Sequence, residues 1–170
     1  MLVFHSTPQV SWSLWFKDIA DRIGALILLA LTFPVWIAAM IGIRLSSPGP
    51  IFFCQQRSGH YGKPFKMWKF RTMYADAEAR RKELEDRNEM DGPVFKITDD
   101  PRIFPLGRWL RRLSIDELPQ LWNVLIGDMS FVGPRPEDWD IVQKDWDASS
   151  RAEILSLRPG ITSPASIIYR

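Results

Sequence analysis

The chain of 170 residues is poor in the side chains from which zinc sites and disulfide frameworks are built. It has one cysteine, Cys54, and two histidines, His5 and His60. A single cysteine excludes an internal disulfide and is usual in a reducing compartment. Two histidines with no cysteine pair leave no recognisable zinc-binding pattern.

Several common catalytic motifs are missing as well. The sequence has no P-loop, no dinucleotide-binding glycine fingerprint and no Gly-x-Ser-x-Gly nucleophile elbow. Its net charge is +2, from 22 basic and 20 acidic residues. Because so small an excess creates little attraction for a polyanion, we expect no nucleic-acid partner.

A long uncharged segment runs from Ile23 to Ile43, between Arg22 and Arg44. A bilayer-spanning helix needs roughly 20 apolar residues, so this segment is long enough to span. A secretory signal peptide fits poorly, because no small-residue cleavage site follows the apolar run. A buried core helix of a soluble protein is the remaining interpretation.

Two features favour a hairpin that enters and leaves the membrane on one face. Pro34, in the middle of the segment, removes a backbone donor and kinks or breaks a helix. Lys17 and Arg22 precede the segment, and Arg44 and Arg57 follow it, so the positive-inside rule favours keeping both ends in the cytoplasm. A straight, slightly kinked span is the alternative, because membrane helices tolerate proline.

A β-hairpin is predicted after the apolar segment. Residues 51–55 form a strand, residues 58–64 a loop, and residues 65–71 a returning strand. The two-residue alternation of a strand places Lys69 and Arg71 on one face. These two cations could hold an anion together, or they could form an exposed basic edge that discourages aggregation.

Two helices and a short strand are predicted further along the chain. Residues 75–88 are highly charged and predict a solvated helix, and residues 94–97 predict a short strand. Apolar residues spaced i, i+3, i+4 and i+7 predict an amphipathic helix: Leu106, Trp109, Leu110 and Leu113. Its opposite face carries Arg108, Arg111 and Arg112. Such a helix could lie on an anionic membrane surface, or it could be an ordinary surface helix that packs on the protein core.

Two adjacent carboxylates, Asp116 and Glu117, lie near the start of a predicted helix. Ser114 and Glu117 have the spacing of a capping box. In that motif Glu117 would accept a hydrogen bond from the backbone amide of Ser114 and would have a purely structural role. Pro119 supports a different start, because proline favours the first helical position and would leave both acids just outside. In either case a helix N-terminus next to the acids also favours a bound phosphate.

Adjacent carboxylates can divide a phosphoryl-transfer reaction between them. One can attack phosphorus, and the other can hold a divalent cation. Mg²⁺ needs only one or two protein carboxylates, because phosphate oxygens and water supply the other ligands. Arg135 lies between Pro134 and Pro136, which fix the backbone and orient its guanidinium for phosphate.

Many short motifs in one order resemble the bacterial sugar transferases of the monotopic phosphoglycosyl transferase family. The resemblance covers nearly the whole chain, from about Phe16 to Thr162. It is carried by Lys17 with Asp21, Ser47-Pro48-Gly49-Pro50, Gln56-Arg57, Lys69-Phe70-Arg71-Thr72-Met73, Asp99-Asp100-Pro101-Arg102, Arg111-Arg112-Leu113-Ser114-Ile115-Asp116-Glu117-Leu118-Pro119-Gln120-Leu121, Asn123-Val124-Leu125, Gly127-Asp128-Met129-Ser130, Val132-Gly133-Pro134-Arg135-Pro136 and Arg158-Pro159-Gly160-Ile161-Thr162.

The resemblance implies that a sugar 1-phosphate moves from a UDP-sugar to polyprenyl phosphate, typically undecaprenyl phosphate, with release of UMP. It implies that Asp116 is the nucleophile, that a covalent aspartyl phosphosugar forms, and that Glu117 binds Mg²⁺. It also implies a re-entrant apolar helix broken near its centre by a proline. Five basic residues become phosphate or nucleotide ligands: Lys69, Arg71, Arg102, Arg112 and Arg135.

The chain departs from the family pattern in three places. Phe33, rather than the usual serine, precedes Pro34, so Thr32 becomes the candidate hydroxyl for the freed backbone. Asp18 follows Lys17 where arginine is common, and residues 163–166 read Ser-Pro-Ala-Ser in place of Gly-x-x-Gln. We expect a small, minimal member of the family, either compact or shortened at its C-terminus.

The predicted fold is α+β and mostly helical: a monotopic membrane protein with a re-entrant N-terminal helix hairpin, interfacial amphipathic helices and a small β element. Residues 1–15 form an N-terminal segment, 16–46 the membrane helix and 47–170 a cytoplasmic, interfacial catalytic domain. The predicted location is the cytoplasmic face of the bacterial inner membrane, with UDP-sugar, polyprenyl phosphate and membrane lipids as partners. The alternatives are a membrane-anchored module that binds nucleotide sugars or anionic lipids without catalysis, and a scaffold for glycan assembly. No short motif encodes the transferred sugar or the oligomeric state.

Overall fold

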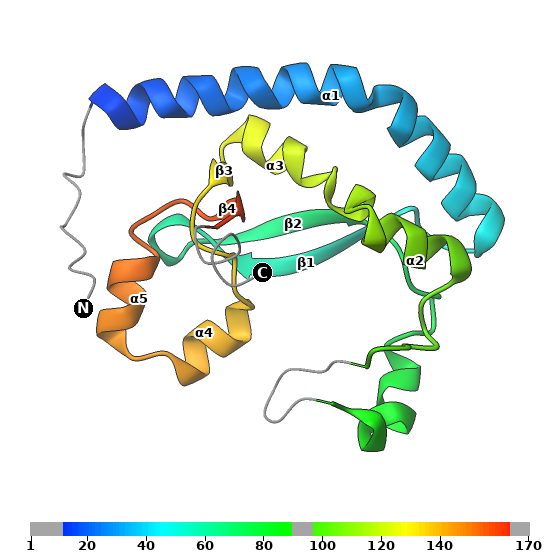
Figure 1. Cartoon of the computed structure of the whole chain (residues 1–170). Helices are drawn as coiled ribbons and strands as arrows, with labels where there is room; N and C mark the ends of the chain where they lie inside the picture. The colour runs from blue at the N-terminus through cyan, green and yellow to red at the C-terminus, as the bar shows by residue number, and fades with distance from the viewer. Residues whose placement is uncertain (1–11, 90–96, 164–170) are drawn as a thin grey trace. The chain divides into compact units, whose positions relative to one another are not determined.

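The computed structural model describes residues 12–89 and 97–163 (Figure 1). In chain order the elements are α1 Trp12–Ser46, β1 Phe52–Ser58, η1 His60–Gly62, β2 Pro64–Phe70, η2 Ala79–Arg87, α2 Pro105–Arg112, η3 Ile115–Glu117, α3 Gln120–Ile126, β3 Ser130–Val132, α4 Trp139–Asp145, α5 Ala148–Ile154 and β4 Gly160–Thr162, where η marks a 3₁₀ helix. The predicted mostly helical fold with a small β element is confirmed. The predicted strand at 94–97 and most of the segment 1–15 lie outside the described residues.

The chain divides into two compact units, each assembled from segments that are far apart in the sequence. Among the described residues, the first unit contains 12–30, 56–65 and 121–163. The second unit contains 31–55, 66–89 and 97–120. Helix α1 and the β1–β2 hairpin contribute residues to both units.

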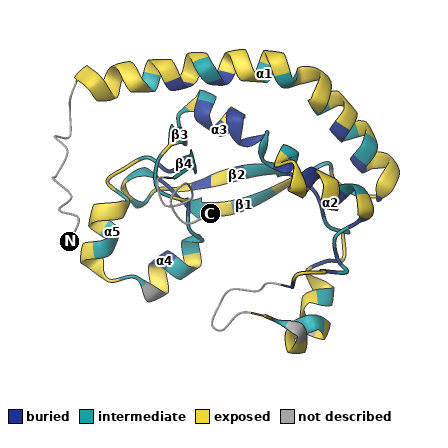
Figure 2. Ribbon diagram, viewed as in Figure 1, coloured by how far each residue is buried: buried dark blue, intermediate teal, exposed yellow. Residues whose placement is uncertain are grey.

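Helix α1 is one continuous helix of 35 residues with Pro34 inside it. By length and composition it could cross a membrane, and its most apolar stretch has a mean hydropathy of 2.4. Most of its residues are exposed, as Figure 2 shows. A core helix of a soluble protein would be mostly covered, so this exposure favours a lipid-facing helix over a core helix. The predicted break into a hairpin is not seen as two separate helices, and re-entry stays a prediction.

In the first unit, the beginning of α1 packs against a two-stranded parallel sheet. Strands β3 and β4 pair Ser130 with Gly160 and Val132 with Thr162. A side chain at Gly24 of α1 would come within 3.0 Å of the Phe131 ring, so a small residue is needed for this approach. Helices α4 and α5 complete the unit, and each begins at an aspartate that caps its first backbone amides.

Charged groups attach the first turns of α1 to the same sheet. Lys17 contacts Asp21 at 2.8 Å and also contacts the Ser130 hydroxyl, which donates to Asp21 at 2.7 Å. Asp18 forms an ion pair with Arg158, just before β4. The departure from the family pattern at Asp18 therefore has a structural partner.

In the second unit, the end of α1 packs on an apolar core. The buried members are Ala39, Ile43, Phe70, Phe104 and Leu110, and they bring together α1, β2 and α2. Small residues again allow close approach: a side chain at Gly42 would come within 2.6 Å of Leu106, and one at Gly107 within 2.2 Å of the Thr72 carbonyl oxygen.

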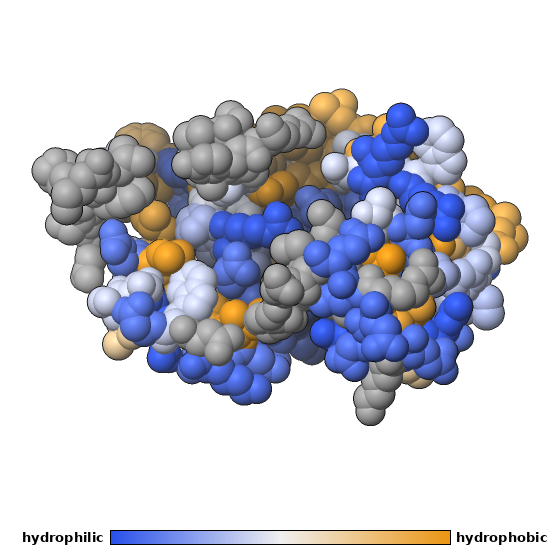
Figure 3. Space-filling model, turned by 60° about the horizontal axis from the view of Figure 1, so that its bottom comes forward, coloured by the Kyte–Doolittle hydropathy of each residue, from blue (hydrophilic) through white to orange (hydrophobic). Residues whose placement is uncertain are grey.

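The hairpin and the amphipathic helix predicted from the sequence are both confirmed. Strand β1 extends beyond its predicted end, to Ser58. On α2, Gly107 and Leu110 are buried, whereas Trp109 is 59% exposed and Leu113, just after the helix, is 61% exposed. The prediction of a helix over 75–88 was wrong in type and length, because only residues 79–87 are helical and they form 3₁₀ turns. Hydrophilic residues predominate over the described surface that Figure 3 brings into view.

Candidate active site

The acid pair lies in a short connection between two helices of the chain. Helix α2 ends at Arg112, Ser114 adopts a left-handed conformation with φ of 54°, and Asp116 and Glu117 form the 3₁₀ turn η3. The Ser114 hydroxyl makes no capping hydrogen bond with the described residues. Helix α3 begins only after Pro119, so the capping-box interpretation is wrong and both acids lie just outside the helix.

Asp116 is a buried carboxylate without an ion-pair partner of its own among the described residues. Only 9% of the residue is exposed. Burial raises the pKa of Asp116, because desolvation penalises the charged form, and the neighbouring Glu117 charge raises it further. Lys69 and Arg111 act in the opposite direction and lower it. Asp116 is thus an acid whose ionisation depends on nearby cations.

Lys69 and Glu117 form an ion pair beside this buried acid. The Lys69 ammonium donates to Glu117 Oε1 at 2.8 Å. The Lys69 side chain is 24% exposed and the Glu117 side chain 36% exposed, so this pair is half open to solvent. The structure therefore brings Lys69, which lies 48 residues before Glu117 in the sequence, to the predicted acid pair Asp116 and Glu117.

Arg71 lies two residues after Lys69, just beyond the end of β2, and it is buried among neutral oxygen atoms. Its guanidinium donates to the Ser47 carbonyl at 2.7 Å, to the Ser47 hydroxyl at 3.0 Å and to the Pro48 carbonyl at 3.0 Å. Only 5% of Arg71 is exposed. It is therefore not part of an exposed basic edge, and these contacts hold the turn that follows α1. Its role as a phosphate ligand stays a prediction.

Arg102 is held even more tightly. Its guanidinium faces the Asp100 carboxylate, with Nη2 donating at 2.6 Å and Nε at 2.9 Å. These hydrogen bonds lower the pKa of Asp100 and raise that of Arg102. Both side chains are less than a tenth exposed. The pair therefore stabilises the segment between η2 and α2, and a direct contact of Arg102 with substrate stays a prediction.

The last turn of α2 supplies two more cations, which have different partners. Arg112 is exposed and lies over the Trp109 ring, with 5.7 Å between guanidinium carbon and ring centroid. Arg111 donates through Nε to the Thr72 hydroxyl at 2.9 Å. The sequence reasoning chose Arg112 and missed Arg111, although the charge of Arg111 acts on Asp116. The two arginines are adjacent in sequence, and the helical spacing did not distinguish them.

Arg135 belongs to the first unit. It is exposed, and its charge acts on Arg57, whose pKa is lowered mainly by burial. Arg57 donates to the Pro136 carbonyl at 3.3 Å, and acidic residues Glu137 and Asp138 also act on it. The loop after β3 therefore carries both basic and acidic groups that act on Arg57. The assignment of Arg135 to phosphate stays a prediction.

The donor groups at the acid pair fit a magnesium ion better than a metal that needs a cage of protein ligands. No cluster of three or more histidine, cysteine, aspartate or glutamate side chains occurs in residues 12–89 and 97–163. Glu117 offers a partly exposed carboxylate next to a second acid. Mg²⁺ accepts one or two carboxylates and takes the rest of its ligands from phosphate and water.

Known proteins share this sequence pattern. A family described as bacterial sugar transferase matches residues 12–170. The chain is 45% identical, over 86% of its length, to the galactosyl transferase CpsE of Streptococcus agalactiae serotype III (strain NEM316). It is 45% identical, over 79% of its length, to a putative undecaprenyl-phosphate N-acetylgalactosaminyl 1-phosphate transferase of Bacillus subtilis (strain 168). It is 43% identical, over 78% of its length, to a UDP-glucose:undecaprenyl-phosphate glucose-1-phosphate transferase of Escherichia coli (strain K12).

The relatives differ in how much of their own length is matched. The aligned region is 32% of the Streptococcus protein and 26% of the Escherichia coli protein. It is 69% of the Bacillus subtilis protein. The aligned region is therefore a part of the longer relatives.

Proposed function

The chain belongs to the bacterial sugar transferase family, and on this premise we propose that it transfers a sugar 1-phosphate from a UDP-sugar to polyprenyl phosphate. The observation that carries the proposal is the burial of Asp116 beside the Lys69–Glu117 ion pair. The relatives support the substrate class, since the Escherichia coli protein is a UDP-glucose:undecaprenyl-phosphate glucose-1-phosphate transferase. Polyprenyl phosphate, a UDP-sugar and the lipids of the membrane are thus the proposed partners.

Asp116 is the proposed nucleophile. Its carboxylate oxygen forms a bond to the phosphorus that carries the sugar, and the bond from that phosphorus to the UMP oxygen breaks. UMP leaves with the electron pair, and an aspartyl phosphosugar remains on the protein. An oxygen of polyprenyl phosphate then attacks the same phosphorus, and the Asp116 carboxylate is released. Both attacking groups are oxyanions, so neither step requires a base.

The surroundings of Asp116 suit this role. Burial removes the water that would otherwise solvate the carboxylate and hydrolyse its phosphoryl adduct. Lys69 lowers the pKa of Asp116 and so favours its ionised form, and it also supplies positive charge where the diphosphate would lie. Arg111 adds a second cation from the end of α2.

Glu117 is the proposed ligand for Mg²⁺. When bound, the ion would neutralise charge on the diphosphate oxygens. The Glu117 carboxylate already accepts from Lys69 through Oε1, so the ion and the ammonium would compete for, or share, this group. Either arrangement gathers positive charge around the transferred phosphorus.

The two ends of α1 contact different segments of the chain. The beginning of α1 contacts Ser130 and Arg158, in the segment 121–163. The end of α1 packs on Phe70 and Phe104, in the segment 66–120.

Within residues 12–89 and 97–163, helix α1 is the one helix that is long and apolar enough to span. We place both ends of α1 on one face of the membrane, because the positive-inside rule applies to the cations at each end and Pro34 allows a re-entrant bend. The proposed face is the cytoplasmic side of the bacterial inner membrane, because cations flank both ends of the apolar segment.

The proposal is tested by UMP release from a panel of UDP-sugars, with the protein in detergent or nanodiscs and with polyprenyl phosphate and Mg²⁺ present. The wild-type chain should release UMP and form a lipid-linked phosphosugar with at least one sugar. Asp116→Asn should release none, whereas Asp86→Asn, an exposed acid of η2, should behave as the wild type. Binding of UDP-sugar without UMP release would instead identify a binding module, and partner capture without turnover a scaffold.

A further inference from the structure

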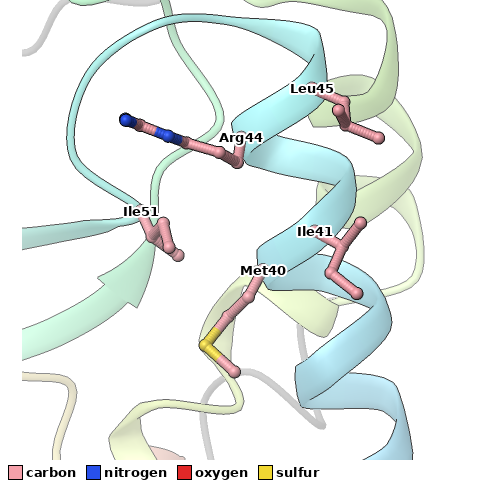
Figure 4. Close-up of a pocket in the computed structure, with 5 residues that line it drawn as sticks. All are labelled: Met40, Ile41, Arg44, Leu45 and Ile51. Atoms are coloured by element: carbon pink, nitrogen blue, oxygen red, sulfur yellow. The ribbon is translucent and has the colours of Figure 1, made fainter.

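The end of α1 carries an apolar groove with one cation at its edge. A cavity of about 270 Å³ is lined by Met40, Ile41, Arg44, Leu45 and Ile51 (Figure 4). All five belong to the second unit. Leu45 is 82% exposed and Ile41 is 56% exposed, so the described chain leaves this apolar surface open.

Arg44 is only partly engaged by the protein. Its Nη1 donates to the Gly49 carbonyl at 3.1 Å, and that contact uses one of the five N–H groups of the guanidinium. Figure 4 shows Arg44 and Ile51 extending to the same side of α1. The guanidinium is thus anchored at the turn after the helix while most of its donors remain available.

The charge near the groove is positive and has no acidic counterpart. Arg44 acts on the buried Arg71, whose pKa is lowered by burial and by this like charge. In residues 12–89 and 97–163, neither arginine forms an ion pair with a carboxylate. The carbonyls of Ser47, Pro48 and Gly49 offset part of this charge, as expected at a helix C-terminus. Two guanidinium groups against neutral oxygens still leave an excess that favours an anion.

An amphiphile with an anionic head group could contact both the apolar groove and the Arg44 guanidinium at its edge. The groove lies at the boundary of the apolar segment, which is where lipid phosphates meet the hydrocarbon of a bilayer. A free phosphate would leave the apolar wall uncovered, and a neutral lipid would leave the cation unpaired. We propose that this groove binds an anionic phospholipid, with its phosphate on Arg44 and the upper part of one acyl chain along Met40, Ile41, Leu45 and Ile51. This inference concerns lipid binding and does not depend on the proposed transfer reaction.

The test uses the full chain in phosphatidylcholine nanodiscs without UDP-sugar. A phosphatidylglycerol or phosphatidylcholine probe with a photoreactive acyl chain is added, and labelled peptides are identified by mass spectrometry. The phosphatidylglycerol probe should label residues 40–51 about five-fold more than the phosphatidylcholine probe, the effect of one cation near an anionic head. Arg44→Gln should bring the two probes to the same level.

Two further variants separate the contributions of charge and groove. Arg81→Gln, a matched loss of an exposed arginine on η2, should leave labelling unchanged. Leu45→Ser keeps the charge but removes an exposed apolar wall, and it should lower labelling by both probes without affecting folding.

Three results would overturn the inference. Equal labelling of the wild-type chain by both probes would remove the role of the head group. Loss of labelling on addition of inorganic phosphate would show that the acyl chain is irrelevant. Displacement of the phosphatidylglycerol probe by an equimolar amount of polyprenyl phosphate would assign the groove to the acceptor lipid instead.

Discussion

Replacing Lys69 by methionine tests how the buried nucleophile is kept charged. Lys69→Met removes the ammonium that lowers the pKa of Asp116, and it leaves the Glu117 charge, which raises that pKa, without its partner. Both changes favour the protonated form of Asp116. Because only the carboxylate can attack phosphorus, the variant should need a higher pH to reach the same activity.

The magnitude differs between stability and activity. At an effective dielectric constant of about 20, charges as close as the 2.8 Å between Lys69 and Glu117 attract by roughly 6 kcal/mol before desolvation. Glu117 is 36% exposed, so screening and side-chain entropy reduce the net loss of unfolding free energy to about 1 kcal/mol or less. Asp116 is buried and less screened, so the acidic limb of its activity profile should move to higher pH.

The assay is the pH dependence of UMP release, with thermal unfolding measured on the same samples. Lys69→Arg should keep the limb near its wild-type position, because the charge is retained. Lys66→Met, on the other face of β2, is the matched control and should leave the limb in place. An acidic limb that stays unmoved or shifts to lower pH in Lys69→Met would refute the coupling between Lys69 and Asp116.

Three further outcomes are expected from other residues of the second unit. Asp116→Asn should unfold at a temperature no lower than the wild type, since it removes a buried charge; a large drop would mean that Asp116 is structural. Glu117→Gln should require more Mg²⁺ for half-maximal UMP release, and an unchanged Mg²⁺ titration would exclude Glu117 as the metal ligand. Arg102→Met should lower the urea-unfolding free energy by about 3–5 kcal/mol, because Asp100 would be left charged, buried and unpaired; a loss below about 1 kcal/mol would contradict the buried-pair account.

The sequence predicted the elements that depend on local patterns. Hydropathy located α1, the turn residues and alternation located the β1–β2 hairpin, and helical spacing located α2. The order of short motifs identified the family and the acid pair. The charged stretch of η2 was less predictable, because its residues have no apolar face whose packing would select a regular α-helix.

The environment of each cation was not predictable in the same way. Arg71 donates to the hydroxyl and the carbonyl oxygen of Ser47, which lies 24 residues earlier. The residue pattern of β2 does not predict this partner. Arg111, which the sequence pattern did not separate from Arg112, lowers the pKa of Asp116. Long-range contacts decide whether a cation is structural or free to meet a substrate.

The proposed reaction passes through a covalent intermediate at one carboxylate, and peptide mass measurement tests this most directly. The chain would be mixed with UDP-sugar and Mg²⁺ in the absence of polyprenyl phosphate, quenched and digested. A mass increase equal to one phosphosugar on the peptide containing Asp116, which disappears when polyprenyl phosphate is added, is the predicted result. Formation of the lipid-linked product by a chain that never carries this adduct would contradict the account.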